Sequence, residues 1–306
     1  MGKIAFVFPG QGAQYVGMGQ DLYEQSPHAR KIFDMADQRR PGTSAQCFSG
    51  DQEELKQTKN TQPCLYCVDM ASAYALQQSG VQPDMVAGFS LGEVAAAAFA
   101  GVLSYEEGFD LVCQRGALMQ ESSLQFDSAM VAVVRLPFET VEALCRKFSY
   151  VYPVNYNCPG QLVVAGLREE LGAFKEAVKA AGGKALPLPV SGAFHTPFMG
   201  KAALGLNQKL HYAHFSTPEI PLYSNYLAEP YRDNARELLV MQLINPVRWV
   251  ETIENMIADG ADTFIEVGAG KTLSGFISKI NSEVRVFNVE DSASLAKTLA
   301  GVQSIA

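Results

Sequence analysis

A serine, an arginine and a histidine far apart in the chain have the types and surroundings that nucleophilic catalysis needs. The serine is Ser90, in the pentapeptide Gly88–Gly92, which has the pattern G-x-S-x-G. An apolar run precedes it and the helix-forming run Glu93–Ala100 follows, as in a nucleophile elbow. On such a turn the helix N-terminus favours developing negative charge. The pattern alone also fits a serine that caps a helix, but the strand-to-helix setting favours a nucleophile.

A serine nucleophile needs a general base within hydrogen-bond reach, and the chain has four histidines. His195 lies in Ser191–Pro197, a loop rich in small residues after an apolar extended run, where a catalytic group can be presented at a domain seam. We therefore predict that His195 is the base. The others are expected to be partly buried residues with satisfied hydrogen bonds: His28, His211 and His214.

Two backbone amides are candidates for an oxyanion hole. The N–H of Leu91 would point into the site from the elbow, and Gln11 is the natural second donor because it follows the first strand. The turn Pro9–Gly12 is too short for a dinucleotide fingerprint, since the spacing G-x-G-x-x-G fails at Tyr15. By itself the turn also fits an ordinary connection between a strand and a helix.

Arg115 lies on an apolar helical stretch, Phe109–Met119, where an unpaired cation would be costly. Some carboxylate should therefore meet it. An acid of the protein itself is one source, and the carboxylate of a substrate is the other. Because guanidinium binds carboxylate in a bidentate fork, the second possibility would select a diacid-derived acyl group over acetyl.

Three patterns that imitate cofactor or metal sites do not indicate one. The turn Val267–Thr272 resembles the end of a phosphate loop but lacks the required first glycine. Cys64 and Cys67 form a lone C-x-x-C, for which helical packing is the better interpretation. His211 and His214 share that spacing without a further cluster. We therefore expect no metal and no cofactor.

Composition restricts the class of protein. The 306 residues are 48% hydrophobic and 18% charged, as in a folded enzyme with a sizeable core. Lysine and arginine number 24 against 32 acids, with no long basic run, which argues against nucleic-acid binding. No apolar stretch approaches the ~20 residues that a membrane span needs, and the start is no cleavable leader. Scattered cysteines fit reduced thiols. We expect a cytoplasmic monomer.

The elements that must position these residues indicate an α/β sheet. Lys3–Phe8 and Met85–Phe89 resemble buried parallel strands, and Tyr66–Gln78 between them has the length and composition of a helix. Two further strands of the sheet are predicted at Thr263–Val267 and Val284–Asn288. Such alternation places function at the strand ends.

From residue 128 to 190 the pattern changes to βαββαβ, the ferredoxin-like arrangement. The turn Asn157–Gly160 would join its two middle strands. We predict a ferredoxin-like small subdomain at 126–190, inserted into a large subdomain formed by 1–125 and 191–306. The expected strands cover 129–134, 151–155, 162–165 and 184–190, and the expected helices cover 138–148 and 169–181.

Seven segments together resemble the malonyl-CoA:acyl carrier protein transacylases nearly end to end. In chain order they are FPGQGAQ, GFSLGE, QRGALMQ, NCPGQLVVAG, GAFHTPFM, QLINPVRW and EVGAGKTLSGF. The resemblance implies an α/β-hydrolase-like large subdomain, a ferredoxin-like small one and a cleft between them. It also implies transfer of malonyl from malonyl-CoA to the phosphopantetheine thiol of acyl carrier protein for fatty acid synthesis, with release of coenzyme A.

The resemblance assigns a role to each candidate residue. It makes Ser90 the nucleophile, His195 the base, Arg115 the clamp on the malonyl carboxylate, and Gln11 with Leu91 the oxyanion donors. It further implies that the main-chain carbonyl of Gln242 orients the histidine and that Gln62 borders the pocket. One departure is Phe89, where many members carry histidine; we expect altered packing there, with activity kept.

Other functions stay open at this point. The same chemistry fits a free-standing acyltransferase of a polyketide assembly line, and it fits a serine hydrolase or thioesterase if water reaches the acyl-serine. The sequence around His195, G-A-F-H, resembles malonyl-selective members and favours the malonyl substrate. A carrier-protein-binding scaffold without activity is disfavoured because Ser90, His195 and Arg115 are all present.

Overall fold

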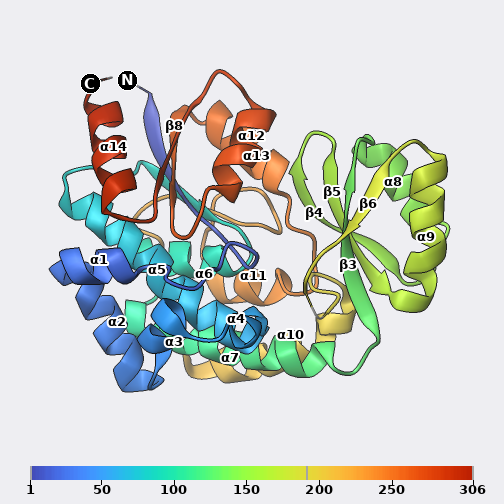
Figure 1. Cartoon of the computed structure of the whole chain (residues 1–306), viewed down its shortest axis with the longest axis horizontal. Coiled ribbons are helices and arrows are strands. Elements are labelled where there is room, and N and C mark those ends of the chain that lie inside the picture. The colour runs from blue at the N-terminus through green and yellow to red at the C-terminus, as the bar shows by residue number, and fades with distance from the viewer. Residues whose placement is uncertain (1, 191, 305–306) are drawn as a thin grey trace.

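A computed structural model describes residues 2–190 and 192–304 (Figure 1). It contains a five-stranded parallel sheet with strand order β7-β2-β1-β8-β9 and a four-stranded antiparallel sheet with order β4-β5-β3-β6. Helices surround the parallel sheet, and the antiparallel sheet lies to one side with its own two helices. The predicted α/β class, with a small second sheet, is confirmed.

The parallel sheet brings two of the candidate turns to the same edge. β1 and β2 are parallel neighbours, so the turns after them, which carry Gln11 and Ser90, leave from the same side. Four of the five strands were predicted, with ends displaced by up to two residues; the two-residue β7 was missed because it is too short to show a pattern. The strands are β1 (Lys3–Phe8), β2 (Met85–Gly88), β7 (Leu222–Tyr223), β8 (Ala261–Val267) and β9 (Arg285–Val289).

Most helices belong to the parallel-sheet part of the chain. They are α1 (Gln20–Gln25), α2 (Pro27–Arg39), α3 (Thr43–Ser49), α4 (Gln52–Lys56), α5 (Thr58–Gln78), α6 (Leu91–Phe99), α7 (Tyr105–Ser123), α10 (Gly200–Lys209), α11 (Ala235–Met241), α12 (Trp249–Ala258), α13 (Thr272–Ile280) and α14 (Ser292–Gln303), with the 3-10 turns η1 (Pro197–Met199) and η2 (Leu210–Tyr212). Helices α5 and α7 pack against each other.

Helix α5 begins at Thr58, well before the predicted start at Tyr66. The added turns are polar in sequence, which is why a pattern of apolar residues misses them. Except for the exposed Lys59 they are nevertheless buried, because tertiary hydrogen bonds satisfy their polar side chains: Asn60 accepts from Arg40 at 2.9 Å, and Gln62 accepts from Arg115 at 2.8 Å. Helix α5 therefore includes a buried polar first part, which sequence periodicity did not predict.

The antiparallel sheet has the predicted βαββαβ order and the ferredoxin-like strand arrangement. Its elements are β3 (Ser128–Val134), α8 (Phe138–Cys145), β4 (Val151–Cys158), β5 (Gln161–Leu167), α9 (Arg168–Ala180) and β6 (Lys184–Pro187). β6 and α8 end three residues earlier than predicted. A separate apolar core lies between this sheet and its helices. The domain boundaries stay a prediction, and Ser191, at one of them, lies outside the described residues.

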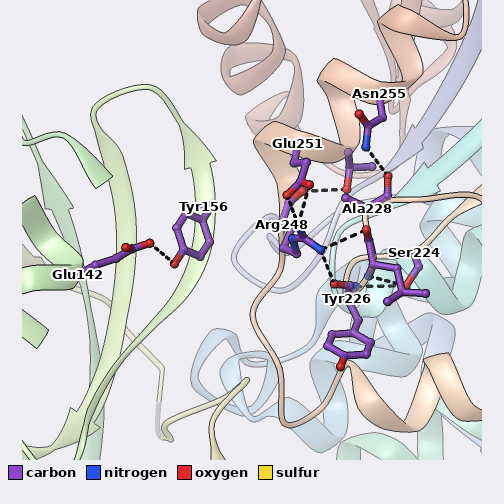
Figure 2. A network of polar contacts seen from close by, with 10 residues as sticks. Glu142, Tyr156, Ser224, Tyr226, Ala228, Arg248, Glu251 and Asn255 are labelled. Atoms are coloured by element: carbon purple, nitrogen blue, oxygen red, sulfur yellow. Dashed lines mark hydrogen bonds and ion pairs between the residues drawn. The ribbon is translucent and has the colours of Figure 1, made fainter. Parts of the chain in front are cut away.

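Main-chain hydrogen bonds join β4 of the antiparallel sheet to the short segment that precedes α12. The N–H of Val247 donates to Val154 O at 2.8 Å, and the N–H of Tyr156 donates to Val247 O at 3.0 Å. Beside this bridge, Tyr156 and Arg248 line a cavity of about 480 Å³ between the two parts (Figure 2). The guanidinium of Arg248 donates to Leu227 O at 3.2 Å and pairs with Glu251, which fixes the start of α12.

Within the described residues no helix has both the length and the apolar character that a membrane crossing requires. All six cysteines are free thiols, and five of them are buried. Their interpretation as packing residues agrees with these positions.

Gly92 offers a test of the close packing at the catalytic edge. A Cβ added there would lie 2.0 Å from Phe8 O, so a Gly92→Ala protein should lose about 3 kcal/mol of unfolding free energy. Gly172 is the matched control, since a Cβ there meets no atom within 4 Å and helix α9 favours alanine. Chemical denaturation measures both; equal stability of the two variants would contradict the packing described here.

Candidate active site

Ser90 lies between the end of β2 and the start of α6, in a backbone conformation that residues other than glycine rarely adopt. Its φ is 54° and its ψ is −101°. Asn225 holds this turn: its Oδ1 accepts from the Ser90 N–H at 2.7 Å, and its Nδ2 donates to Gly88 O. A strained turn that persists because its neighbours hold it is typical of functional sites.

His195 lies within hydrogen-bond reach of the serine. Its Nε2 is 2.8 Å from Ser90 Oγ, and its Nδ1 is 2.7 Å from the main-chain oxygen of Gln242. A carbonyl oxygen can only accept, so Nδ1 carries the proton and Nε2 of the neutral ring is left to accept from the hydroxyl. His195 also has a positive φ of 61°. Its loop is held to the small sheet, where Ala193 N donates to Ser128 Oγ at 3.1 Å.

The environment keeps the imidazole neutral. Burial lowers the pKa of His195 to about 4, and the positive charge of Arg115 acts in the same direction. Hydrogen bonds to the main chain at Gln242 and Asn245 oppose this shift. A neutral imidazole is the form that can accept a proton from Ser90.

Arg115 reaches the same point from α7. Its Nη2 donates to Ser90 Oγ at 3.1 Å and to Gln242 Oε1 at 2.7 Å, while Nη1 donates to Gln62 Oε1 at 2.8 Å. Only 1% of the residue is exposed. Burial lowers its pKa to about 10, against the opposing influence of Glu93.

No carboxylate of the described residues lies within ion-pair distance of Arg115. Of the two sources expected for its carboxylate partner, an acid of the protein itself is therefore wrong. Neutral oxygens take that place, and Nε has no hydrogen-bond partner in the described part of the chain. Within the described residues the buried Arg115 donates hydrogen bonds to neutral oxygens, and it lies next to the candidate nucleophile Ser90. Such a cation is suited to an anionic substrate.

A cavity of about 70 Å³ is lined by Ser90, His195 and Arg115. Both sheets contribute to its wall: Gln11 and Phe89 come from the parallel part, and Met130 and Asn155 from the antiparallel part. A larger cavity of about 270 Å³ adjoins it and shares Gln11. Another surface cavity, of about 710 Å³ beside α10 and α11, is lined by none of the three catalytic candidates.

The remaining sequence candidates also border the site. Gln11 Oε1 accepts from Thr58 Oγ1 at 2.6 Å, and Gln62 Nε2 donates to the same hydroxyl at 3.1 Å. Leu91 is the first residue of α6, so its N–H has no acceptor in a preceding helical turn. Phe89 packs edge-on against Trp249, with ring centroids 5.4 Å apart.

Two buried polar residues of the site were missed by the sequence reasoning. Asn225 lies in a loop after β7 where nothing in the sequence distinguishes it. Glu93 did offer a signal, since it is an acid inside the apolar helix α6, and it is fully buried. Burial raises the pKa of Glu93 to about 8, although hydrogen bonds from Tyr231 and Asn225 and the charge of Arg115 act in the opposite direction.

The patterns that resemble a phosphate loop and a C-x-x-C site are a turn and a packed pair of cysteines, as predicted. Val267–Thr272 connects β8 to α13, and Cys64 and Cys67 are buried on α5. In 2–190 and 192–304 no group of three His, Cys, Asp or Glu residues could hold a metal ion. The other three histidines are exposed, so their expected partial burial was wrong: His28, His211 and His214.

Comparison with known proteins gives likenesses that extend nearly end to end. A family model described as an acyl transferase domain matches residues 5–296. A malonyl CoA-acyl carrier protein transacylase of Bacillus subtilis (strain 168) is 40% identical over 299 residues, covering 95% of this chain and 94% of its own. A solved transacylase of that name from Clostridium perfringens has a TM-score of 0.95 at 38% identity, with 99% and 98% covered. A malonyl-transacylase in complex with its type II polyketide acyl-carrier protein has a TM-score of 0.94 at 36% identity, with 98% and 99% covered.

The depressed pKa of His195 predicts an unusual pH profile. The second-order rate of Ser90 labelling by a fluorophosphonate should hold as pH falls past 6.5, the ordinary histidine value, and decline only toward about 4. Folded His195 binds a proton less readily than the unfolded residue does, so its contribution to stability is lost as pH falls from 6.5 toward 4. Mass spectrometry measures labelling, with Ser90→Ala as the unlabelled control. An inflection at 6.5 or above would contradict this.

Proposed function

Because this chain belongs to the acyl transferase domain family, as its seven motifs predicted, we propose that it transfers malonyl from malonyl-CoA to the phosphopantetheine thiol of acyl carrier protein. The transfer passes through an ester on Ser90 and supplies fatty acid synthesis. The observation that carries the proposal is the Arg115 guanidinium, buried within 3.1 Å of Ser90 Oγ and met by no carboxylate of the described residues. The substrate would bring that carboxylate.

In the first half-reaction His195 Nε2 takes the proton of Ser90 as Oγ bonds to the thioester carbon. The carbon–sulfur bond then breaks, and the coenzyme A sulfur leaves with the proton from His195. In the second half-reaction the carrier-protein thiol gives its proton to His195 and attacks the ester. Ser90 Oγ leaves and recovers the proton, so each step returns the imidazole to its neutral form.

Main-chain amides would stabilise the oxyanion of each tetrahedral intermediate. We assign this role to the N–H groups of Leu91 and Gln11, which follow the neighbouring strands β2 and β1. The hydrogen bond from Thr58 to the Gln11 side chain holds that loop beside the cavity. Gln242 orients His195 through its carbonyl oxygen.

Arg115 would distinguish malonyl from acetyl. The free carboxylate of the malonyl group can accept from a guanidinium that is already desolvated, and acetyl has no group to offer. The narrow inner cavity also limits the acyl group, because Met119, Met130 and Phe194 occupy its wall. A small, largely apolar chamber leaves little room for water, which favours transfer over the hydrolase or thioesterase alternative.

A polyketide pathway is the second candidate. It is favoured by the likeness to the transacylase that was solved with its type II polyketide carrier protein. The chemistry is the same in both pathways, so the identity of the carrier protein decides between them. A cytoplasmic location belongs to this proposal, and the six free thiols fit a reducing compartment.

Intact-mass spectrometry tests the acyl-enzyme directly. With malonyl-CoA alone, the wild-type protein should gain one malonyl group on Ser90, and addition of phosphopantetheinylated carrier protein should remove it. Ser90→Ala should gain nothing. Rapid release of free malonate without carrier protein would instead identify a hydrolase.

Replacing Arg115 tests the carboxylate clamp. Arg115→Ala and Arg115→Lys should weaken malonyl-CoA binding by about 2 to 5 kcal/mol, while acetyl loading changes little or improves. Arg168→Ala is the matched control, since this exposed arginine pairs with Asp127 away from the cavity. Loading rates with malonyl-CoA and acetyl-CoA give the preference. An unchanged preference in the Arg115 variants would place the clamp elsewhere.

A further inference from the structure

The side chain of Gln242 lies where the catalytic contacts meet. Its Oε1 accepts from Arg115 Nη2 at 2.7 Å. Its Nε2 donates to Glu93 Oε2 at 2.9 Å and to Ser90 O at 3.2 Å. One fully buried amide therefore turns its oxygen toward a cation and its nitrogen toward two acceptors. These contacts are additional to the main-chain bond to His195.

Shape alone does not fix this orientation. The oxygen and nitrogen of an amide have nearly the same size, so a flipped Gln242 would fill the same space. After a flip its NH₂ would face Arg115, which can only donate, and its oxygen would face Glu93, which when ionised can only accept. The charged groups on either side therefore decide which end of the amide meets the guanidinium.

Glu93 is built to receive hydrogen bonds. Tyr231 Oη donates to its Oε1 at 2.5 Å and Asn225 N donates to the same atom at 3.2 Å, which leaves Oε2 for Gln242. All three neighbours are donors, so the ionised carboxylate fits without conflict. In the described part of the chain no cation lies within ion-pair distance of it. When the carboxyl is ionised, its charge and that of Arg115 compensate each other across the Gln242 amide.

The intervening amide has a consequence for substrate binding. A carboxylate in direct contact with Arg115 would occupy the fork that a substrate carboxylate needs. With Gln242 between them, Glu93 stabilises the buried cation and leaves its substrate-facing side to Ser90. The arrangement separates stabilisation of the charge from occupation of the binding position.

We infer that Glu93 is a positioning residue: it fixes the Gln242 amide with its oxygen on Arg115, and so holds the guanidinium beside Ser90 in the orientation that favours malonyl over acetyl. The inference rests on the proposed malonyl transfer, because selectivity for a free carboxylate is its measurable effect.

Glu93→Gln is the main test. Tyr231 and Asn225 both donate, so they hold the oxygen of the new amide and turn its NH₂ toward Gln242 Nε2. Gln242 then flips and presents NH₂ to Arg115. We expect kcat/KM for malonyl loading of Ser90 to fall about tenfold or more, while acetyl loading changes less than about threefold. A purely structural role would lower both rates together.

Tyr231→Phe is the matched control. It removes one hydrogen bond from the same buried carboxylate but leaves the contact between Glu93 Oε2 and Gln242. Its malonyl-to-acetyl ratio should stay within about threefold of wild type, since the amide keeps its orientation. A ratio that fell as far as in Glu93→Gln would overturn the inference, because disturbance of the acid alone would then suffice.

Gln242→Met provides an independent measurement if Glu93→Gln does not fold. It removes the amide and keeps the main-chain oxygen that holds His195. The malonyl-to-acetyl ratio should fall, and adding Glu93→Gln should lower it no further, because Glu93 acts through that amide. A ratio that survives Gln242→Met overturns the inference.

The two proposals fail in different ways. If the wild-type protein does not load malonyl at all, the proposed function is wrong. If wild type prefers malonyl and a folded Glu93→Gln keeps that preference, only the positioning role is wrong.

Discussion

The site depends on one constraint: the buried Arg115 guanidinium has no carboxylate of the described residues within ion-pair distance. Burying the Arg115 guanidinium removes its hydration, so other polar groups must compensate for that loss. Three neutral oxygens do so, from Gln62 on α5, Gln242 at the end of α11 and Ser90 before α6. Glu93, when ionised, contributes a negative charge one hydrogen bond further away. The chain can thus fold with the Arg115 guanidinium buried, and the guanidinium can still bind an anion beside Ser90.

The proposed catalytic pair, Ser90 and His195, also depends on two strained backbone positions. Ser90 and His195 both have positive φ, a conformation that costs on the order of 1 to 3 kcal/mol for each such residue. Asn225 holds the serine turn, and the main-chain oxygen of Gln242 holds the imidazole. Both side chains line one small cavity, and Ser90 Oγ lies 2.8 Å from His195 Nε2 there.

The segment 242–248 contacts both His195 and the antiparallel sheet. Residues 242–248 begin with the carbonyl that orients His195 and end at Arg248, where α12 starts. Between them Val247 exchanges main-chain hydrogen bonds with β4. Any displacement of the antiparallel sheet would therefore act on the histidine from both sides, through this segment and through the loop that Ser128 holds.

The sequence by itself determined what depends on local pattern and residue type. The strand-to-helix turn at Ser90, the βαββαβ order and the strands β1, β2, β8 and β9 all follow from apolar periodicity and glycine-rich turns, which neighbouring residues encode. Only the tertiary structure decided what surrounds Arg115. The polar start of α5, the buried Glu93 and the loop residue Asn225 become part of the site through hydrogen bonds between residues that lie as far as 149 positions apart. Hydrogen bonds between residues so far apart produce no periodic pattern in the sequence. Each of these polar residues therefore looks isolated until the folded chain shows its partner.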